Sequence, residues 1–139
     1  MNRYSGQCEC GAVTLTICLP QLLTQYEPRA CDCDFCQSRN ISYLSDPQGE
    51  IEIHAQTKLQ SLQQGSNQAR FLCCGDCSVV VAGVHEFSTG LKGALNANLL
   101  DDRSMFKSAQ PVSPKLLEPS EKLARWNKVW SHVTLREST

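Results

Sequence analysis

Residues 8–19 read Cys-Glu-Cys-Gly-Ala-Val-Thr-Leu-Thr-Ile-Cys-Leu, so a pair of cysteines leads directly into a strictly alternating stretch. The apolar members of the alternation are Val13, Leu15, Ile17 and Leu19. Successive residues of a strand point to opposite faces of a sheet, and the pattern therefore predicts a half-buried β-strand. The cysteine pair thus stands next to a sheet-forming segment.

Other sheet-forming segments follow, to about residue 100. Residues 51–55 repeat the alternation after the turn-forming sequence Asp46-Pro47-Gln48-Gly49, and residues 69–72 and 79–87 are further strand candidates. Within residues 51–55, Ile53 and Ala55 take the inward face, so we expect His54 to point to solvent. The fold class is therefore mainly β, and we expect mostly antiparallel pairing.

Near the C-terminus the spacing of the apolar residues changes from that of a strand to that of a helix. Pro111, Pro114 and Pro119 mark an extended connector, and Ser120 follows as a candidate helix cap with Glu121 in the first turn. An apolar stripe at helical spacing comes next: Leu123, Trp126, Val129, Trp130 and Val133. We expect one amphipathic helix that closes the chain and packs on its own sheet, because so short a helix needs tertiary contacts. The alternative is that the two tryptophans form a partner surface.

The chain has 139 residues, with 13 Lys and Arg against 14 Asp and Glu and a formal net charge of −1. This length suits one globular domain, and the balanced charge argues against nucleic-acid binding and membrane-surface binding. The longest apolar run, residues 79–82, is far shorter than the roughly 20 residues of a membrane span. The polar residues 1–6 leave no room for a signal peptide before Cys8, so we expect a cytoplasmic protein.

Nine cysteines remain to be explained, and eight of them fall in three clusters. The clusters are Cys8 and Cys10; Cys31, Cys33 and Cys36; and Cys73, Cys74 and Cys77. Disulfides are rare in a reducing compartment, so clustered cysteines there are first interpreted as metal ligands or redox groups. Cys18 stands apart from all three clusters.

The spacing predicts two zinc ions per chain. Cys74 and Cys77 form a CxxC knuckle, and with the CxC pair Cys8 and Cys10 they complete a closed four-sulfur site of structural type. The middle cluster keeps three sulfurs, from Cys31, Cys33 and Cys36, and so leaves a fourth position open for substrate. A competing partition, in which the middle cluster shares sulfurs with Cys73 or Cys18, stays open at this stage.

These motifs resemble the glutathione-dependent formaldehyde-activating enzyme family, which also contains the centromere protein V domain. The resemblance rests on Cys8-Glu9-Cys10-Gly11-Ala12-Val13, on the CxCxxC of residues 31–36, and on the apolar run into CxxC at residues 71–77. The resemblance covers roughly residues 5–100 and implies a β-tent-like domain of two packed sheets, which we place at residues 1–110, and the prolines and the helical stripe add residues 111–139 as connector and C-terminal helix. It also implies a structural zinc at the outer motifs, a catalytic zinc at Cys31, Cys33 and Cys36, and Cys73 as a core residue.

The chain departs from the family pattern around the middle motif. Asp32 and Gln37 stand where many members have His and Arg, and Asn40 replaces a frequent glycine. Because glutathione carries two carboxylates, the loss of an Arg weakens the inference to that particular thiol.

The chemistry implied is carbon–sulfur bond formation, because zinc coordination removes the proton of an incoming thiol and its sulfur can then attack an aldehyde carbon. We expect a carbon–sulfur lyase acting on a thiol–aldehyde adduct, with glutathione plus formaldehyde giving S-hydroxymethylglutathione, or a related pair. The alternatives are a non-catalytic zinc-stabilised binding module and a thiol redox or metal-buffering protein. The oligomeric state is left open, a homodimer included.

Candidates for other roles are few. His85 is the best candidate for a general acid, whereas His132 is expected on the C-terminal helix as a packing or surface residue. Asp32 and Asp34 either take part in catalysis or bond loop amides near the metal. The run Asn96-Ala97-Asn98 either places amides near a pocket or ends a strand.

Overall fold

The computed structural model describes residues 1–31, 34–39, 41–63, 68–113 and 116–137. Its elements, in chain order, are β1 (Asn2–Gln7), β2 (Val13–Leu19), η1 (Leu23–Gln25), β3 (Arg29–Cys31), α1 (Asp34–Ser38), β4 (Ser42–Leu44), β5 (Glu50–Ala55), β6 (Gln60–Gln63), β7 (Arg70–Cys73), β8 (Val80–Phe87), β9 (Gly90–Asn96), η2 (Ala97–Leu99), η3 (Arg103–Met105), β10 (Gln110–Val112), α2 (Pro119–Val129) and β11 (Ser131–Glu137). The protein is mainly β, as predicted. Among the described residues there is no helix with the length and hydropathy that a membrane span requires.

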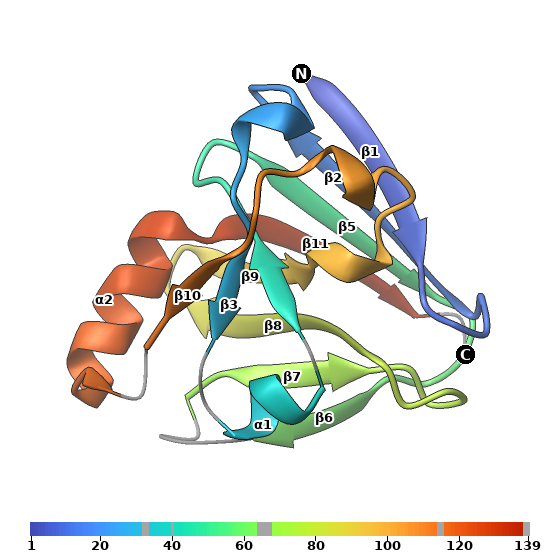
Figure 1. Ribbon diagram of the computed structural model, residues 1–139. Helices are drawn as coiled ribbons and strands as arrows, with labels where there is room; N and C mark the ends of the chain where they lie inside the picture. The colour runs from blue at the N-terminus through green and yellow to red at the C-terminus, as the bar shows by residue number, and fades with distance from the viewer. Residues whose placement is uncertain (32–33, 40, 64–67, 114–115, 138–139) are drawn as a thin grey trace.

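The strands form one hydrogen-bonded network that branches at β9. Its main path runs β1-β2-β5-β11-β9-β4-β3-β10, and β8, β7 and β6 extend from the other edge of β9. Figure 1 shows β1, β2, β5 and β11 across the upper part of the molecule and β6, β7 and β8 across the lower part. The two expected sheets are thus joined through β9, and the sheet does not close. Pairing is antiparallel except for β5 with β11 and β3 with β10.

The largest core cluster is built on the predicted alternation. Leu15 pairs with Ile53 and Ile17 pairs with Ile51, and all four side chains are at most 1% exposed. Burial of one such side chain contributes about 1.5–3 kcal/mol to folding, so the β2–β5 pair is a large part of the stability. His54, on the opposite face of β5, is exposed as predicted.

The C-terminal helix is confirmed, but its predicted ends are wrong. The helix cap is Glu118, whose backbone N–H donates to the Glu121 side chain at 3.0 Å, and Ser120 lies inside the helix. The helix ends at Val129, and Val133, expected on its apolar stripe, belongs to β11. Residues 131–135 alternate between buried and exposed positions, and β11 lies between β5 and β9, where it fills a place in the sheet.

The C-terminal end of α2 contacts the sheet region through two tryptophans. The rings of Trp126 and Trp130 stack with centroids 4.7 Å apart, and Trp130 is only 7% exposed. These rings pack in a cluster with Ala69 and Ala94 from the sheet region. The tryptophans therefore bind the helix to its own domain.

Candidate metal centre

The first cysteine pair lies in the tight turn between β1 and β2. The backbone N–H of Cys8 donates to the Val13 carbonyl at 3.0 Å, and the Val13 N–H donates to the Cys8 sulfur at 3.3 Å. Gly11 has a φ of +80°, which a residue with a Cβ rarely adopts. The turn therefore requires the glycine that follows Cys10 in the sequence.

The second pair lies in the turn between β7 and β8, and it is closed in the same way. The Cys74 N–H donates to the Val79 carbonyl at 3.0 Å, and the N–H groups of Asp76 and Cys77 lie 3.4 and 3.5 Å from the Cys74 sulfur. A Cβ on Gly75 would collide with the backbone carbonyl of Lys58, so only glycine fits there. Backbone donors thus surround the sulfur before any metal binds.

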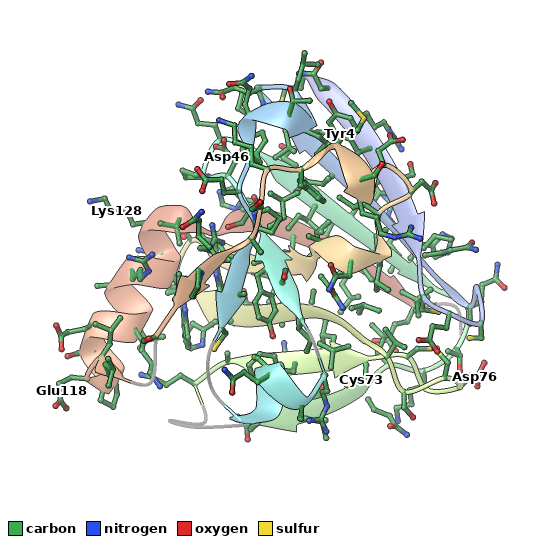
Figure 2. The ribbon with its side chains drawn as sticks, in the orientation of Figure 1. Tyr4, Asp46, Cys73, Asp76, Glu118 and Lys128 are labelled. Carbon is green, nitrogen blue, oxygen red and sulfur yellow. The ribbon has the colours of Figure 1, made fainter. Side chains whose placement is uncertain are left out.

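The two turns meet on one side of the molecule (Figure 1). Asp76 in the second turn lies on the side opposite Glu118 at the start of α2 (Figure 2). The four sulfurs of Cys8, Cys10, Cys74 and Cys77 all lie within 4.8 Å of one another.

The sulfur spacing fits a tetrahedral ion. The Cys8 and Cys10 sulfurs are 3.6 Å apart, and those of Cys10 and Cys74 are 3.5 Å apart. A tetrahedron with metal–sulfur bonds of about 2.3 Å has sulfur–sulfur edges of about 3.8 Å. The predicted set of four cysteines is therefore brought together, and it can hold a metal ion.

The crowded thiols titrate unequally. Burial raises the pKa of the Cys77 thiol, but N–H groups of Val79 and Cys10 and the thiols of Cys74 and Cys8 outweigh it and lower that pKa to about 7. At Cys10 the N–H of Ala12 lowers the pKa, but desolvation and the three neighbouring sulfurs outweigh it and raise the pKa to about 12. The Cys77 thiolate therefore forms easily, whereas a second negative charge at Cys10 is unfavourable. A bound cation would offset the repulsion between the thiolates.

The structure describes two of the three cysteines of the middle motif. Cys31 ends β3 and is half-buried, Cys36 lies in α1 and is buried, and Cys33 lies outside the described residues. Asp32 and Asn40 also lie outside them, and Gln37 is exposed. The predicted three-sulfur site therefore stays a prediction.

Sequence reasoning missed Tyr43 beside this motif. Its hydroxyl lies 3.3 Å from the Cys36 sulfur, because β4 pairs with β3 and sets Tyr43 opposite Arg29. The ring also packs near Phe71, with centroids 6.4 Å apart. Nothing in the three-residue strand Ser42–Leu44 marks the tyrosine, since only the pairing register brings it to Cys36.

The remaining cysteines stand outside the cluster. Cys73 is buried against Ile41 and Val80 and is a core residue, as predicted, and burial raises the pKa of its thiol. Cys18 is half-buried on β2, opposite Glu50 of β5.

His85 and His132 both lie on strands. His85 is half-buried, and its Nδ1 lies 2.6 Å from the Gln68 carbonyl, with its ring edge-on to Phe87. His132, expected on a helix, is exposed on β11 because the strand begins at Ser131.

Comparison with known proteins decides the family. The sequence pattern of the family described as glutathione-dependent formaldehyde-activating enzyme matches residues 3–114. The chain belongs to this family. The matched segment contains the closed cluster and the middle motif, and it ends before α2 and β11.

A solved structure supports the fold of this family member. A crystal structure of a Rhodobacter sphaeroides protein is 20% identical and superposes with a TM-score of 0.52 over 77% of this chain and 97% of that chain. At that identity the likeness concerns the fold alone. No curated protein matches the sequence.

Proposed function

We propose that this family member is a zinc-dependent carbon–sulfur lyase of the cytoplasm that acts on the adduct of a small thiol and an aldehyde. Glutathione and formaldehyde, which form S-hydroxymethylglutathione, are the first pair to test, and a related pair is the second. The protein carries two zinc ions, a closed one at Cys8, Cys10, Cys74 and Cys77 and an open one at Cys31, Cys33 and Cys36.

One observation carries the proposal. The four sulfurs of the outer motifs converge within 4.8 Å in a chain that belongs to this family. Four sulfurs satisfy a tetrahedral zinc completely, so that site has no position for a substrate. The middle cysteines are then a separate donor set, and three protein ligands would leave one position open.

The proposed reaction adds a thiol to a carbonyl group. When bound at the open site, zinc supplies a position at which a substrate thiol loses its proton. The carbon–sulfur bond then forms as the carbonyl π bond breaks, and the carbonyl oxygen takes up one proton. Overall, the thiol proton ends on the new hydroxyl group, so the reaction needs no oxidant or reductant.

The chain's own residues would position the reacting sulfur. Cys31 and Cys36 come from β3 and α1, which are adjacent in sequence, and α1 is fixed because the Cys36 sulfur lies 3.3 Å from the Tyr43 hydroxyl. Tyr43 is itself held by the pairing of β4 with β3 and β9. A Cys36 thiolate can only accept, so when Cys36 holds a metal the hydroxyl would donate to it and orient it as a ligand.

The test is exchange spectroscopy at equilibrium, because the uncatalysed addition is itself fast. NMR should show faster interconversion of aldehyde and adduct with wild-type protein than with Cys33→Ser at equal concentration. Cys18→Ser, which changes a cysteine outside all three clusters, should behave as wild type.

Equal rates for wild type, Cys33→Ser and buffer, over several thiols and aldehydes, would contradict the activity. A folded chain whose middle cysteines bind no added thiol would then favour the zinc-stabilised binding module. Easy loss of zinc followed by pairing of the cysteines would favour a redox or metal-buffering role.

A further inference from the structure

A pocket of about 730 Å³ opens between the cysteine turns and the residues that follow α1. Sites for small molecules have volumes of roughly 300–1,000 Å³, so a tripeptide-sized ligand fits. Its wall comes from four parts of the chain: the two cysteine turns, the turn after α1, and the segment from the end of β9 to η3. Among the proposed zinc ligands that the structure describes, Cys8 alone lines it.

Several of the residues that line the pocket are buried. Ile41 and Val80 are buried there. Asn96, only 6% exposed, donates from Nδ2 to the Val80 carbonyl at 2.9 Å and accepts at Oδ1 from the Asn98 N–H at 3.1 Å. Both alternatives for the Asn96-Ala97-Asn98 run therefore hold, since it ends β9 and also lines a pocket.

Two arginines line the pocket from different walls. Arg39 comes from the turn after α1, and Arg103 comes from η3. An Nη1–H group of Arg103 donates to the Leu100 carbonyl at 3.1 Å, which fixes the direction of its side chain. A guanidinium presents its N–H groups in a planar fork that matches a carboxylate, so each arginine is a carboxylate-binding group.

Two carboxylates line the same pocket. Glu9 belongs to the first cysteine turn, and Asp101 follows η2, where its backbone N–H donates to the Ser5 carbonyl at 2.9 Å. The lining therefore has two positive and two negative side chains, all exposed. Such a lining is complementary to a zwitterion, whose carboxylates would face the arginines and whose ammonium group would face the acidic side chains. It is not complementary to a simple anion.

The pocket is connected to the middle motif through the backbone. The N–H groups of Arg39 and Ile41 both donate to the Cys36 carbonyl, each at 3.2 Å. The two pocket residues Arg39 and Ile41 are therefore held by the backbone of Cys36.

We propose that Arg39 and Arg103 determine which thiol this protein accepts, by binding the carboxylates of a small zwitterionic thiol in this pocket. Glu9 and Asp101 face the ammonium group of the same ligand. The inference rests on the proposed function for the identity of the ligand as a thiol, but the binding of the charged groups does not require the reaction.

The test separates binding from chemistry by using S-methylglutathione, which keeps both carboxylates and the ammonium group but has no free thiol. Calorimetry should detect binding of this compound to wild-type protein. Its affinity for Arg39→Gln and for Arg103→Gln should be at least about tenfold lower than for wild type, because each variant loses a charge-assisted hydrogen bond. Arg136→Gln, in the exposed part of β11, is the matched control and should bind as wild type. The diethyl ester of S-methylglutathione should bind no variant.

Equal binding to wild type, Arg39→Gln and Arg103→Gln, or binding of the diethyl ester as tight as that of the diacid, would overturn the assignment. So would the absence of S-methylglutathione binding to a folded wild-type chain. Circular dichroism of each variant shows that the fold is kept.

The exchange measurement then distinguishes this inference from the proposed function. If both are right, Arg39→Gln raises KM for glutathione far more than it lowers kcat, and leaves exchange of uncharged 2-mercaptoethanol unchanged. Arginine-dependent binding without any exchange would support the pocket and overturn the proposed function. Exchange that is equally fast with charged and uncharged thiols and insensitive to Arg39→Gln would support the proposed function and overturn the assignment of the pocket.

Discussion

Cys10 is exposed, and yet its sulfur lies 3.5 Å from that of the fully buried Cys74, 64 positions later in the sequence. A metal ion at this point would join the β1–β2 turn to the β7–β8 turn. Structural zinc contributes on the order of 10 kcal/mol to folding in small domains, so the loss of one ligand should be costly even at an exposed position.

At the residue scale we therefore predict that Cys10→Ser yields an unfolded or insoluble chain, and that Cys77→Ser does the same. Cys18→Ser is the matched control, since Cys18 is more buried than Cys10 but lies outside the cluster. Its thermal unfolding, followed by circular dichroism, should stay close to that of wild type. The prediction is contradicted by equal unfolding temperatures for Cys10→Ser and Cys18→Ser.

The sequence was sufficient to predict the cluster, because cysteine spacing is a local property and a closed structural zinc site is completed by four ligands, which the two outer motifs supply. It was not sufficient for Tyr43, since that residue reaches Cys36 through the pairing of β3 with β4. Arg103 reaches the pocket in a comparable way, from an element more than sixty residues after Arg39. Such contacts follow from the sheet register and have no local signal.

At the scale of elements, β11 determines how the C-terminus joins the domain. Ser131 is fully buried at the start of the strand, donates its hydroxyl to the Asp46 carbonyl at 2.6 Å, and accepts from the Asp46 N–H at 2.9 Å. These two bonds fix the beginning of β11 against the turn before β5. The helical prediction was wrong here because two patterns overlap in the sequence: Trp130 and Val133 fit the period of a helix, and residues 131–135 fit the alternation of a strand. The strand forms because β11 pairs with both β5 and β9.

We predict that Ser131→Ala lowers the free energy of unfolding by about 1–3 kcal/mol, because it removes two hydrogen bonds and leaves the half-buried Asp46 N–H without its acceptor. Thr134→Ala changes an exposed residue of the same strand and should lower it by less than about 0.5 kcal/mol. Urea unfolding of both variants measures the difference. Equal effects would mean that the Ser131 bonds do not hold the strand.

Over the molecule as a whole, the fold brings the two outer cysteine motifs together and places Cys31 and Cys36 of the middle motif in β3 and α1, which follow one another in the chain. The fold class follows from the alternating strands, whereas the branching at β9 does not, because one strand pairs with three others. We therefore propose two metal sites of different kinds, a closed one that maintains the fold and one that is open to a substrate.

The most direct measurement is the zinc content per folded chain of wild type and Cys33→Ser, with free thiols counted on the same samples. We predict two zinc ions in wild type and about one in Cys33→Ser, whose circular dichroism and unfolding temperature should stay near those of wild type because the closed site survives. Loss of both fold and all zinc in Cys33→Ser, or an unchanged content of two zinc ions, would contradict the division into a closed and an open site.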